Sequence, residues 1–402
     1  MPVCTCHLRK RLPWLLLLVC GLWPGSVSIA KEGTEAEQAT ERLVAAAVVY
    51  DEIEMQSACQ ELCDLASVAV PHLLPLTEHA NSVVRWKAVA TLEQMGPMPV
   101  REQAKVMKAA VNAATDADAD VRAAAAELAL RWFPQHPETL VIMQRLVSDS
   151  NSVVRSNAWY GCWVLENGSK PIDQLVALLQ DSDWMAADQA AEHLIRIGEP
   201  AEATLLEAAI ELLTQPGSAT SQARLVRTLA AMSRSGAVQS ELLGWLSHEQ
   251  IPVVQAAARA LVDDGETTVP ALRRLLDSKD PKRKVIALET LAAIGPSASS
   301  AYAQIHMYIW SESPVAIAAI LAIPRIKSPD DELLSDYGAL IESPKRDVRG
   351  AAVAAIATWG PAATSFESRL ARLQQTDPVD FVRQAAKNTL LQIRTPRESV
   401  RE

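Results

Sequence analysis

A pattern that recurs about every 33 residues constrains this chain more than any other feature of its sequence. Each period has a polar residue, a run of Ala and Leu at helical spacing, and often a closing Gly. The pattern is clearest from Asp280 to Gly295, and the segments Asn81–Gly96, Asp183–Gly198 and Lys345–Gly360 have the same span. A fixed period of this size is typical of a solenoid of stacked helix pairs.

Each period predicts two helices. The second has apolar residues at helical spacing and ends at Gly, which we expect to adopt a left-handed C-cap before Pro opens the next helix. The first is rich in Leu, as from Val269 to Leu276. One such pair cannot bury its apolar stripe without stacked neighbours. We therefore predict an all-α fold, an α-α superhelix of about ten two-helix repeats.

The composition agrees with packed helices. Gly accounts for only 15 of 402 residues and aromatic residues for 4%, whereas Ala and Leu are abundant. Ala and Leu lose the least free energy on entering a helix. These proportions disfavour a β-sandwich, a β-barrel and a disulfide-stabilised miniprotein.

The first thirty residues have the layout of a secretory signal peptide. Basic residues at 9–11 precede an apolar run, Leu12 to Leu22, and the small residues Ser28 and Ala30 predict cleavage after Ala30. The apolar run is about half of the ~20 residues that a membrane span needs. We expect an exported protein, periplasmic or extracellular; an uncleaved N-terminal membrane anchor and a lipoprotein at Cys20 are the alternatives.

The predicted domains follow from these two features. Residues 1–30 are the signal peptide, 31–68 an N-terminal helical cap, 69–394 the repeat solenoid and 395–402 a disordered tail.

The chain is acidic, with a formal net charge of −10, and the signal carries three positive and no negative charges. The exported chain is therefore a poor candidate for binding nucleic acid or an anionic membrane. We expect neither a nucleic-acid partner nor stable membrane insertion after cleavage. The odd set Cys59, Cys63 and Cys162 that remains implies no complete disulfide framework, and we interpret these residues as small buried hydrophobes.

The repeated pattern Asp, five residues, Arg, then Ala and Leu and finally Ile-Gly-Pro resembles HEAT repeats. The short period and the sequence pattern V-R-x-x-A-A-x-x-L resemble those of the phycobilisome-lyase-type HEAT-like subgroup. The resemblance covers about residues 70–394 and implies an armadillo-like α-solenoid whose second helices form the surface that holds partners. The pattern is weakest around Leu225, Gln255 and Ile317, and Ala187 replaces the Arg of its repeat.

The Asp-Arg pair of each repeat predicts a structural ladder. An Asp before the second helix suits the positive helix start, and an Arg six residues later can reach the Asp of its own or a neighbouring repeat. The complete pairs are Asp116 with Arg122, Asp149 with Arg155, and Asp377 with Arg383. A charged ligand groove is the functional alternative for these residues.

The sequence contains no recognisable catalytic signature. Phosphate-loop, His-Glu-x-x-His, Gly-x-Ser-x-Gly and Cys-x-x-Cys motifs are absent. Deoxyhypusine hydroxylase is similar in architecture and binds iron through several His-Glu pairs, but this chain has one such dipeptide, His248-Glu249. We therefore predict no catalytic residue, no metal ligand and no cofactor.

The candidate binding residues lie on the second helices. The ninth position after the polar cap reads Ala90, Glu127, Tyr160, Glu192 and Glu289 in the clearest repeats, which predicts an acidic inner face. Aromatic residues with polar neighbours are enriched at binding hot spots. We expect Tyr160 and Trp163 to be partly exposed and Trp159 to lie in the core. The predicted partner-binding residues are Trp86, Glu127, Tyr160, Trp163 and Glu192.

One basic patch interrupts the acidic chain, and it consists of Arg273, Arg274, Lys282, Arg283 and Lys284. It could hold an acidic partner, although helix starts often carry solvated charges of this kind. Taken together, the sequence predicts a non-catalytic scaffold that binds an unknown protein partner through its concave helical surface. A lyase-type or cofactor-handling accessory of the HEAT-like family is the alternative.

Overall fold

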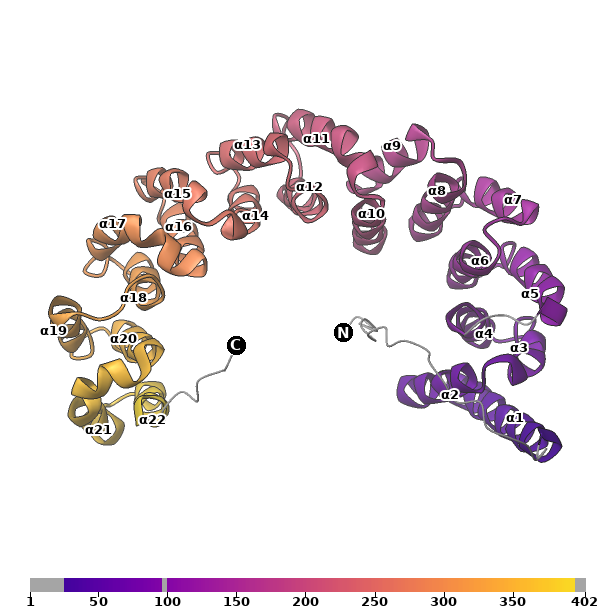
Figure 1. Cartoon of the computed structure of the whole chain (residues 1–402), viewed down its shortest axis with the longest axis horizontal. Helices are drawn as coiled ribbons and strands as arrows, with labels where there is room; N and C mark the ends of the chain where they lie inside the picture. The colour runs from indigo at the N-terminus through magenta and orange to yellow at the C-terminus, as the bar shows by residue number, and fades with distance from the viewer. Residues whose placement is uncertain (1–24, 96–99, 395–402) are drawn as a thin grey trace, which may run out of the picture. The chain divides into compact units, whose positions relative to one another are not determined.

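The structure is a computed structural model that describes residues 25–95 and 100–394. All regular secondary structure in these ranges is helical, which confirms the all-α prediction (Figure 1). The chain divides into two compact units, and the boundary between Ile142 and Met143 falls inside helix α7 (Pro137–Leu146). Most of the predicted signal (1–24), the dipeptide Gly96-Pro97 and the predicted tail (395–402) lie outside the described residues.

The first unit opens with a helical hairpin of α1 (Gly25–Val49) and α2 (Glu52–Leu65) over the predicted N-terminal cap. Asp51 begins α2, because its side chain accepts a hydrogen bond of 3.1 Å from the backbone N–H of Glu54. Leu43 of α1 and Leu62 of α2 are fully buried within this unit. Since α1 begins at Gly25, the predicted cleavage site after Ala30 lies near the start of this helix.

Two helix pairs complete the part of the first unit before α7. They are α3 (Val70–Leu76) with α4 (Ser82–Gln94), and α5 (Val100–Ala113) with α6 (Ala119–Trp132), and a short 3₁₀ segment η1 (Ala66–Val68) precedes them. The second helices α4 and α6 pack side by side.

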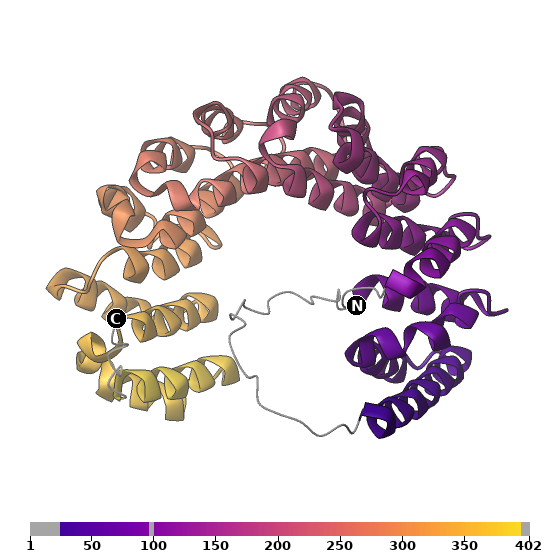
Figure 2. The same ribbon diagram turned by 45° about the vertical axis from the view of Figure 1, so that its right-hand side comes forward.

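The second unit repeats the same arrangement in two rows (Figures 1 and 2). Its second helices form the inner row: α8 (Ser152–Glu166), α10 (Trp184–Ile197), α12 (Ala219–Met232), α14 (Ile251–Ala260), α16 (Pro281–Ile294), α18 (Val315–Ile326), α20 (Arg346–Trp359) and α22 (Asp380–Arg394). Its first helices form the outer row: α9 (Ser169–Leu178), α11 (Glu199–Leu213), α13 (Gly236–Trp245), α15 (Val269–Leu276), α17 (Tyr302–His306), α19 (Asp331–Leu340) and α21 (Glu367–Thr376). Three 3₁₀ segments connect them: η2 (Val262–Thr268), η3 (Gly295–Ala301) and η4 (Gly360–Phe366).

Ten helix pairs therefore follow the N-terminal hairpin in the described ranges, as the sequence period predicts. Each inner helix of the second unit packs against the next inner helix along the row. The buried side chains form one continuous core from Ile172 to Ile393. Ala and Gly let the helices approach closely, since a methyl group on Gly350 would come within 2.5 Å of the Phe381 ring. The core of this unit is thus shared between repeats and not confined to any one of them.

The glycines that end the second helices differ from the sequence prediction in one dihedral angle. Gly198, Gly295 and Gly360 have φ of 70°, 75° and 56°, but their ψ values are −136°, −140° and −133°. The prediction of a left-handed C-cap was right about positive φ and wrong about ψ. These residues occupy the region that mirrors the extended conformation, which is closed to nearly all other residue types.

Gly360→Ala should destabilise the protein by about 1–3 kcal/mol, because Ala is strained at this dihedral angle. Nothing lies within 4 Å of an added methyl group, so the cost comes from the backbone. Gly244→Ala is the matched control, since it lies inside α13 with equally open surroundings. The control should be neutral or stabilising by up to about 1 kcal/mol. Equal urea midpoints for the two variants would contradict this explanation.

The repeated spacing of Asp and Arg produces hydrogen bonds of two kinds. Each Arg donates to backbone oxygens of its own turn, as Arg122 does to the carbonyl oxygen of Asp116 at 2.8 Å. The remaining nitrogens of Arg85, Arg155 and Arg349 reach the Asp of the next repeat. Arg349 forms a bidentate pair with Asp377, at 2.8 and 3.0 Å, and Arg85 forms one with Asp116, at 2.7 and 2.8 Å.

Each ladder Asp also organises the start of its own second helix. Asp116, Asp149 and Asp377 accept hydrogen bonds from the backbone N–H two residues ahead, at 2.8, 2.9 and 2.9 Å. Arg155 and Arg383 donate to the carbonyl oxygens of Asp149 and Asp377, respectively. The pair therefore serves both the turn within a repeat and the contact between repeats.

The ladder is interrupted in the middle of the second unit. Arg155 still reaches Asp181 at 3.4 Å, but Ala187 offers no guanidinium to the following repeat. Other cations take over there. Arg224 donates to Asp188 at 2.9 Å and to the carbonyl oxygen of Leu179 at 3.0 Å.

Asp377→Asn should destabilise the protein by about 3 kcal/mol, because it removes the charged partner of the Arg349 guanidinium. Arg349 is only 9% exposed. The hydrogen bond from Arg349 lowers the pKa of Asp377, so its contribution is present at neutral pH and is lost as the pH falls below about 4. Glu342→Gln is the control, since its pair with Arg372 is exposed and should contribute less than about 1 kcal/mol. Urea unfolding measures both, and equal losses would rule out a buried inter-repeat pair.

Candidate partner-binding surface

From α8 to α16, each inner helix of the second unit has a half-buried or exposed residue at the ninth position after its N-cap. The outer helices of this unit lie along the other side of the inner row (Figure 1). We infer that residues exposed at this position face the inside of this unit's curve. From α8 to α16 the position reads Tyr160, Glu192, Arg227, Arg259 and Glu289, and we name this set the inner stripe. Tyr160 is half-buried and the four charged residues are exposed.

The charge of the stripe differs from the acidic face that the clearest repeats predict. Glu192 and Glu289 are exposed as expected, but Arg227 and Arg259 lie between them. Those two positions belong to the repeats around Leu225 and Gln255, where the sequence pattern is weakest. From α8 to α16 this position is therefore mixed in charge, and the acidic inner face that the clearest repeats suggest does not extend to α12 and α14.

Tyr160 and Trp163 lie together on α8. Both are half-buried, their ring centroids are 6.3 Å apart and their planes differ by 22°. Trp159 is also half-buried, with the ammonium group of Lys170 5.7 Å from its ring centroid. All three rings pack against the core of the second unit on one side, so each can offer only part of its surface to a partner.

A buried histidine supports Tyr160 from the neighbouring repeat. The His193 ring of α10 stacks on Tyr160 with centroids 4.4 Å apart and planes within 5°. Its Nε2 lies 3.0 Å from Oδ1 of Asn157, and Gln189 donates to the same oxygen at 2.5 Å. Sequence reasoning missed this group, since Asn157 and His193 are 36 residues apart and no motif joins them.

The environment of His193 keeps its imidazole neutral. Burial, with a smaller contribution from Arg196, lowers the pKa of His193 to about 3. Its Nδ1 is buried and has no hydrogen-bond partner among the described residues. The neutral ring donates Nε2–H to Asn157 and holds the Tyr160 ring in a fixed position. A preorganised surface of this kind loses less conformational entropy when a partner binds.

Helix α10 adds an exposed apolar face beside this cluster. Trp184 is 62% exposed, Met185 52% and Ile195 40%. Glu192 and Asp188 lie on the same exposed side, and Arg196 is 3.8 Å from Glu192. Exposed aromatic and Met side chains bordered by charges are typical of protein-binding surfaces.

The remaining predicted binding residues, Trp86 and Glu127, belong to the first unit. Trp86 of α4 is half-buried, with the Lys87 ammonium group 4.4 Å from its ring centroid. Glu127 of α6 is exposed. Both residues lie in the first unit, whereas the inner stripe belongs to the second unit.

The predicted basic patch divides into structural and exposed members. Arg283 donates to the backbone oxygens of Leu246, His248 and Glu249 beyond the end of α13, and Lys284 lies 4.6 Å from the Tyr308 ring centroid. Arg273 bonds the side chain of Gln304. Only Arg274 and Lys282 lack a hydrogen bond or ion pair for their charged groups within the described ranges.

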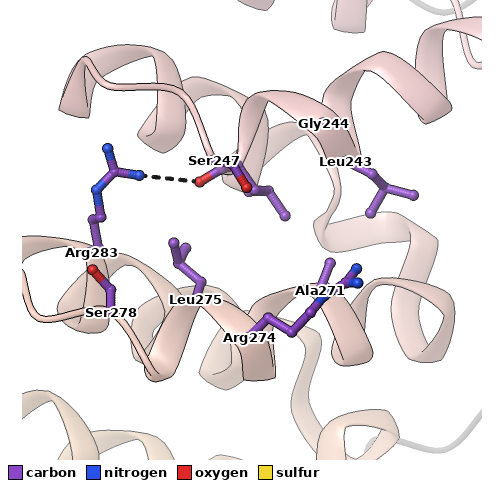
Figure 3. Close-up of a pocket in the computed structure, with 9 residues that line it drawn as sticks. Leu243, Gly244, Ser247, Ala271, Arg274, Leu275, Ser278 and Arg283 are labelled. Carbon is purple, nitrogen blue, oxygen red and sulfur yellow. Dashed lines mark hydrogen bonds between the residues drawn. The ribbon is translucent and has the colours of Figure 1, made fainter.

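Arg274 and Arg283 border a pocket of about 570 Å³ on the outer row (Figure 3). Leu243 and Leu246 line one wall, and Ala271 and Leu275 line the other. Figure 3 shows the Arg283 guanidinium turned toward the α13 end of the pocket, where it is already hydrogen-bonded. The pocket therefore offers little unsatisfied polar chemistry beyond Arg274.

In the His-Glu dipeptide considered for iron binding, both ring nitrogens of His248 are hydrogen-bonded to backbone groups. Nε2 of His248 lies 2.9 Å from the carbonyl oxygen of Leu213, and Nδ1 accepts from the backbone N–H of Gln250 at 3.1 Å. In the described part of the chain, one cluster has metal-ligand chemistry: His306, Glu332 and Asp336 place ligand atoms within 4.8 Å of one another.

The three cysteines among the described residues, Cys59, Cys63 and Cys162, are free thiols. Cys162 is buried as expected, whereas Cys59 and Cys63 are half-buried. Burial raises the pKa of Cys63 and of Cys162 to about 11, so both are protonated at neutral pH. Among residues 25–95 and 100–394, no helix combines the length and apolar character needed to cross a bilayer.

His193→Gln should make the protein less sensitive to acid. The unfolded chain protonates His193 below about pH 6.5, whereas the folded chain does not until about pH 3. Stability of the wild type should therefore fall by about 2 kcal/mol between pH 7 and pH 5 through this residue. Urea midpoints at the two pH values measure the effect. His136→Gln, an exposed control, should keep the wild-type slope, and an unchanged slope in His193→Gln would contradict a buried neutral imidazole.

Comparison with known proteins agrees with the architecture. Residues 70–162 match the family model of HEAT repeats. No curated protein matches the sequence. The solved structure of Kap121p aligns over 91% of this chain and 49% of its own, with 14% identity and a TM-score of 0.54. Kap95p, described with RanGDP, aligns over 88% and 56%, with 13% identity and the same TM-score.

This chain thus spans about half the length of the solved proteins that it matches. At such low identity the likeness concerns the fold. Residues 70–162 therefore consist of HEAT repeats, and the described chain has the fold of a HEAT-repeat solenoid.

Proposed function

We propose that this protein is a non-catalytic scaffold that holds a segment of a partner protein along the inner stripe of its second unit. The observation that carries the proposal is the row of Glu192, Arg227, Arg259 and Glu289, one exposed charge on each consecutive inner helix. A folded chain gains nothing for its own stability from such charges when they lie apart from one another.

Three charges of the stripe are available for a partner. Arg227, Arg259 and Glu289 have no ion-pair partner within the ranges that the structure describes, whereas Glu192 has Arg196 nearby. A segment that binds here would place acidic residues opposite α12 and α14 and basic residues opposite α10 and α16. Complementary charges of both signs, placed in a fixed order, set register and exclude wrong partners more than they add affinity.

The length of the stripe suits an extended peptide or one helix. Neighbouring helices pack about 8–10 Å apart, so the four steps from α8 to α16 span roughly 30–40 Å. An extended segment of about ten to twelve residues covers that distance. Tyr160, Trp163 and Trp184 at one end would supply the apolar anchor that short peptides need.

The solved structures of this fold include complexes with other proteins. Kap121p is described bound to the SUMO protease Ulp1p and bound to Nup53p, at 15% and 14% identity to this chain. These complexes support a protein-binding use of the fold.

We also propose that the protein acts after export, because its first thirty residues have the layout of a signal peptide. A lyase-type accessory of the HEAT-like family stays the alternative.

The double variant Arg227→Glu with Arg259→Glu should bind the partner at least ten times more weakly. The new Glu residues would lie opposite the acidic residues that we expect in the partner, and like charges repel. Quantitative affinity purification of the full chain from its source identifies the partner, and titration with the purified partner gives the affinity. Arg274→Glu with Lys279→Glu is the matched control, since both residues are exposed and lie on or beside the outer row.

The control should bind as the wild type does. Tyr160→Ala with Trp163→Ala should weaken the same complex, and circular dichroism establishes that each variant keeps its fold. Equal binding by the inner and outer charge variants would remove the inner stripe as the binding surface. A bound chromophore in the purified protein would favour the lyase-type alternative.

A further inference from the structure

Three side chains with metal-ligand chemistry meet between two consecutive repeats of the outer row. His306 is the last residue of α17, and Glu332 and Asp336 lie on α19, the next outer helix (Figure 1). Nε2 of His306 is 2.7 Å from Oδ2 of Asp336. One ligand atom from each of the three residues lies within 4.8 Å of the others.

The spacing on α19 explains how two carboxylates share one side. Glu332 and Asp336 are four residues apart, so their side chains lie one turn above the other on the same face of the helix. A helix start favours acidic residues, and this explains Asp330 and Asp331 before them. It does not explain why a histidine of the preceding repeat is aimed at the same face.

The histidine is held in place by its own helix. The ring of Tyr302, one turn earlier on α17, stacks on His306 with centroids 5.4 Å apart and planes within 28°. Both His306 and Asp336 are half-buried, with side chains 22% and 24% exposed. The ring therefore presents Nε2 to the carboxylates in a fixed orientation, as metal-ligating histidines require.

Within the described residues, no Lys or Arg forms an ion pair with Glu332 or Asp336. Lys327, the cation of the neighbouring turn, pairs instead with Asp330 at 2.6 Å and lies 4.0 Å from the Tyr302 ring centroid. In the described ranges Glu332 has no ion-pair partner and Asp336 has only His306. Two adjacent carboxylates without a guanidinium or ammonium group repel each other, and a divalent cation would remove that repulsion.

We propose that His306, Glu332 and Asp336 form a binding site for a divalent first-row transition metal ion, with zinc as its best match. One imidazole nitrogen and two carboxylate oxygens are donors that such ions accept, and three protein ligands leave further positions for water. The His306–Asp336 contact is the one direct hydrogen bond or ion pair between α17 and α19 in the described structure. A bound ion would fasten these two repeats together.

Cobalt(II) titration of the full-length protein tests the site. Co²⁺ in a site of nitrogen and oxygen ligands gives visible d–d absorption without the near-ultraviolet charge-transfer band of a thiolate complex. The expected result is one such site per chain, emptied by competing Zn²⁺. This readout separates the proposed site from Cys59 and Cys63, the one pair of neighbouring thiols in the described ranges.

The variants His306→Gln and Glu332→Gln should each weaken Co²⁺ and Zn²⁺ binding at least tenfold. Glu332 is exposed, so its substitution keeps the apo-protein fold even if His306→Gln disturbs the contact with Asp336. His136→Gln and Glu207→Gln, both exposed residues outside the cluster, are the matched controls and should bind as the wild type does.

Zn²⁺ should also raise the thermal unfolding midpoint of the wild type and of both controls, but not that of Glu332→Gln. Stoichiometric binding that survives His306→Gln and Glu332→Gln, a thiolate charge-transfer band, or no binding at all would each overturn the proposal. The outcome does not depend on the partner-binding function, since the cluster lies on the outer row.

Discussion

Each helix pair of this chain has an apolar edge that only the next pair can cover, and the whole fold depends on this constraint. The buried core of the second unit runs without a break from Ile172 to Ile393. Because the core is shared, the stability of a repeat is largely the stability of its two interfaces. Close approach requires small residues, and Gly350 shows the limit, since a methyl group there would meet Phe381.

Polar contacts then fix how one repeat is set against the next. The bidentate pairs Arg85–Asp116 and Arg349–Asp377 join successive turns on the same side of the helices. In the repeats between them, Arg224 and Arg283 replace this geometry with contacts to Asp188 and to backbone oxygens. These contacts occupy the helix starts and the outer row, which leaves the inner face of the second unit available for other purposes.

The sequence period was sufficient to predict the helical fold, the number of helix pairs and the polar caps of the second helices. It predicted positive φ at Gly198, Gly295 and Gly360, but not their ψ, because ψ depends on how the chain enters the next helix. It also did not predict the positive charges of the inner stripe on α12 and α14. Arg227 and Arg259 lie in the repeats with the weakest pattern, so their equivalence to Glu192 became visible only once the N-caps were located.

Contacts between repeats were the hardest to foresee. His193 supports Tyr160 from the following repeat, and His306 meets Glu332 and Asp336 across another repeat boundary. Residues about thirty positions apart meet only where two helices are in a particular register, and an imperfect period does not determine that register. Periodicity thus identifies which face a residue occupies, whereas side-chain chemistry between repeats requires the structure.

The central claim is that the inner stripe, from Tyr160 on α8 to Glu289 on α16, holds a partner protein. Hydrogen–deuterium exchange of the full chain with and without its purified partner tests this claim most directly. We predict slower exchange in α8, α10, α12, α14 and α16 of the complex, with little change in the outer helices α9, α11, α13 and α15. Protection confined to the outer row, or to helices outside α8–α16, would contradict the account.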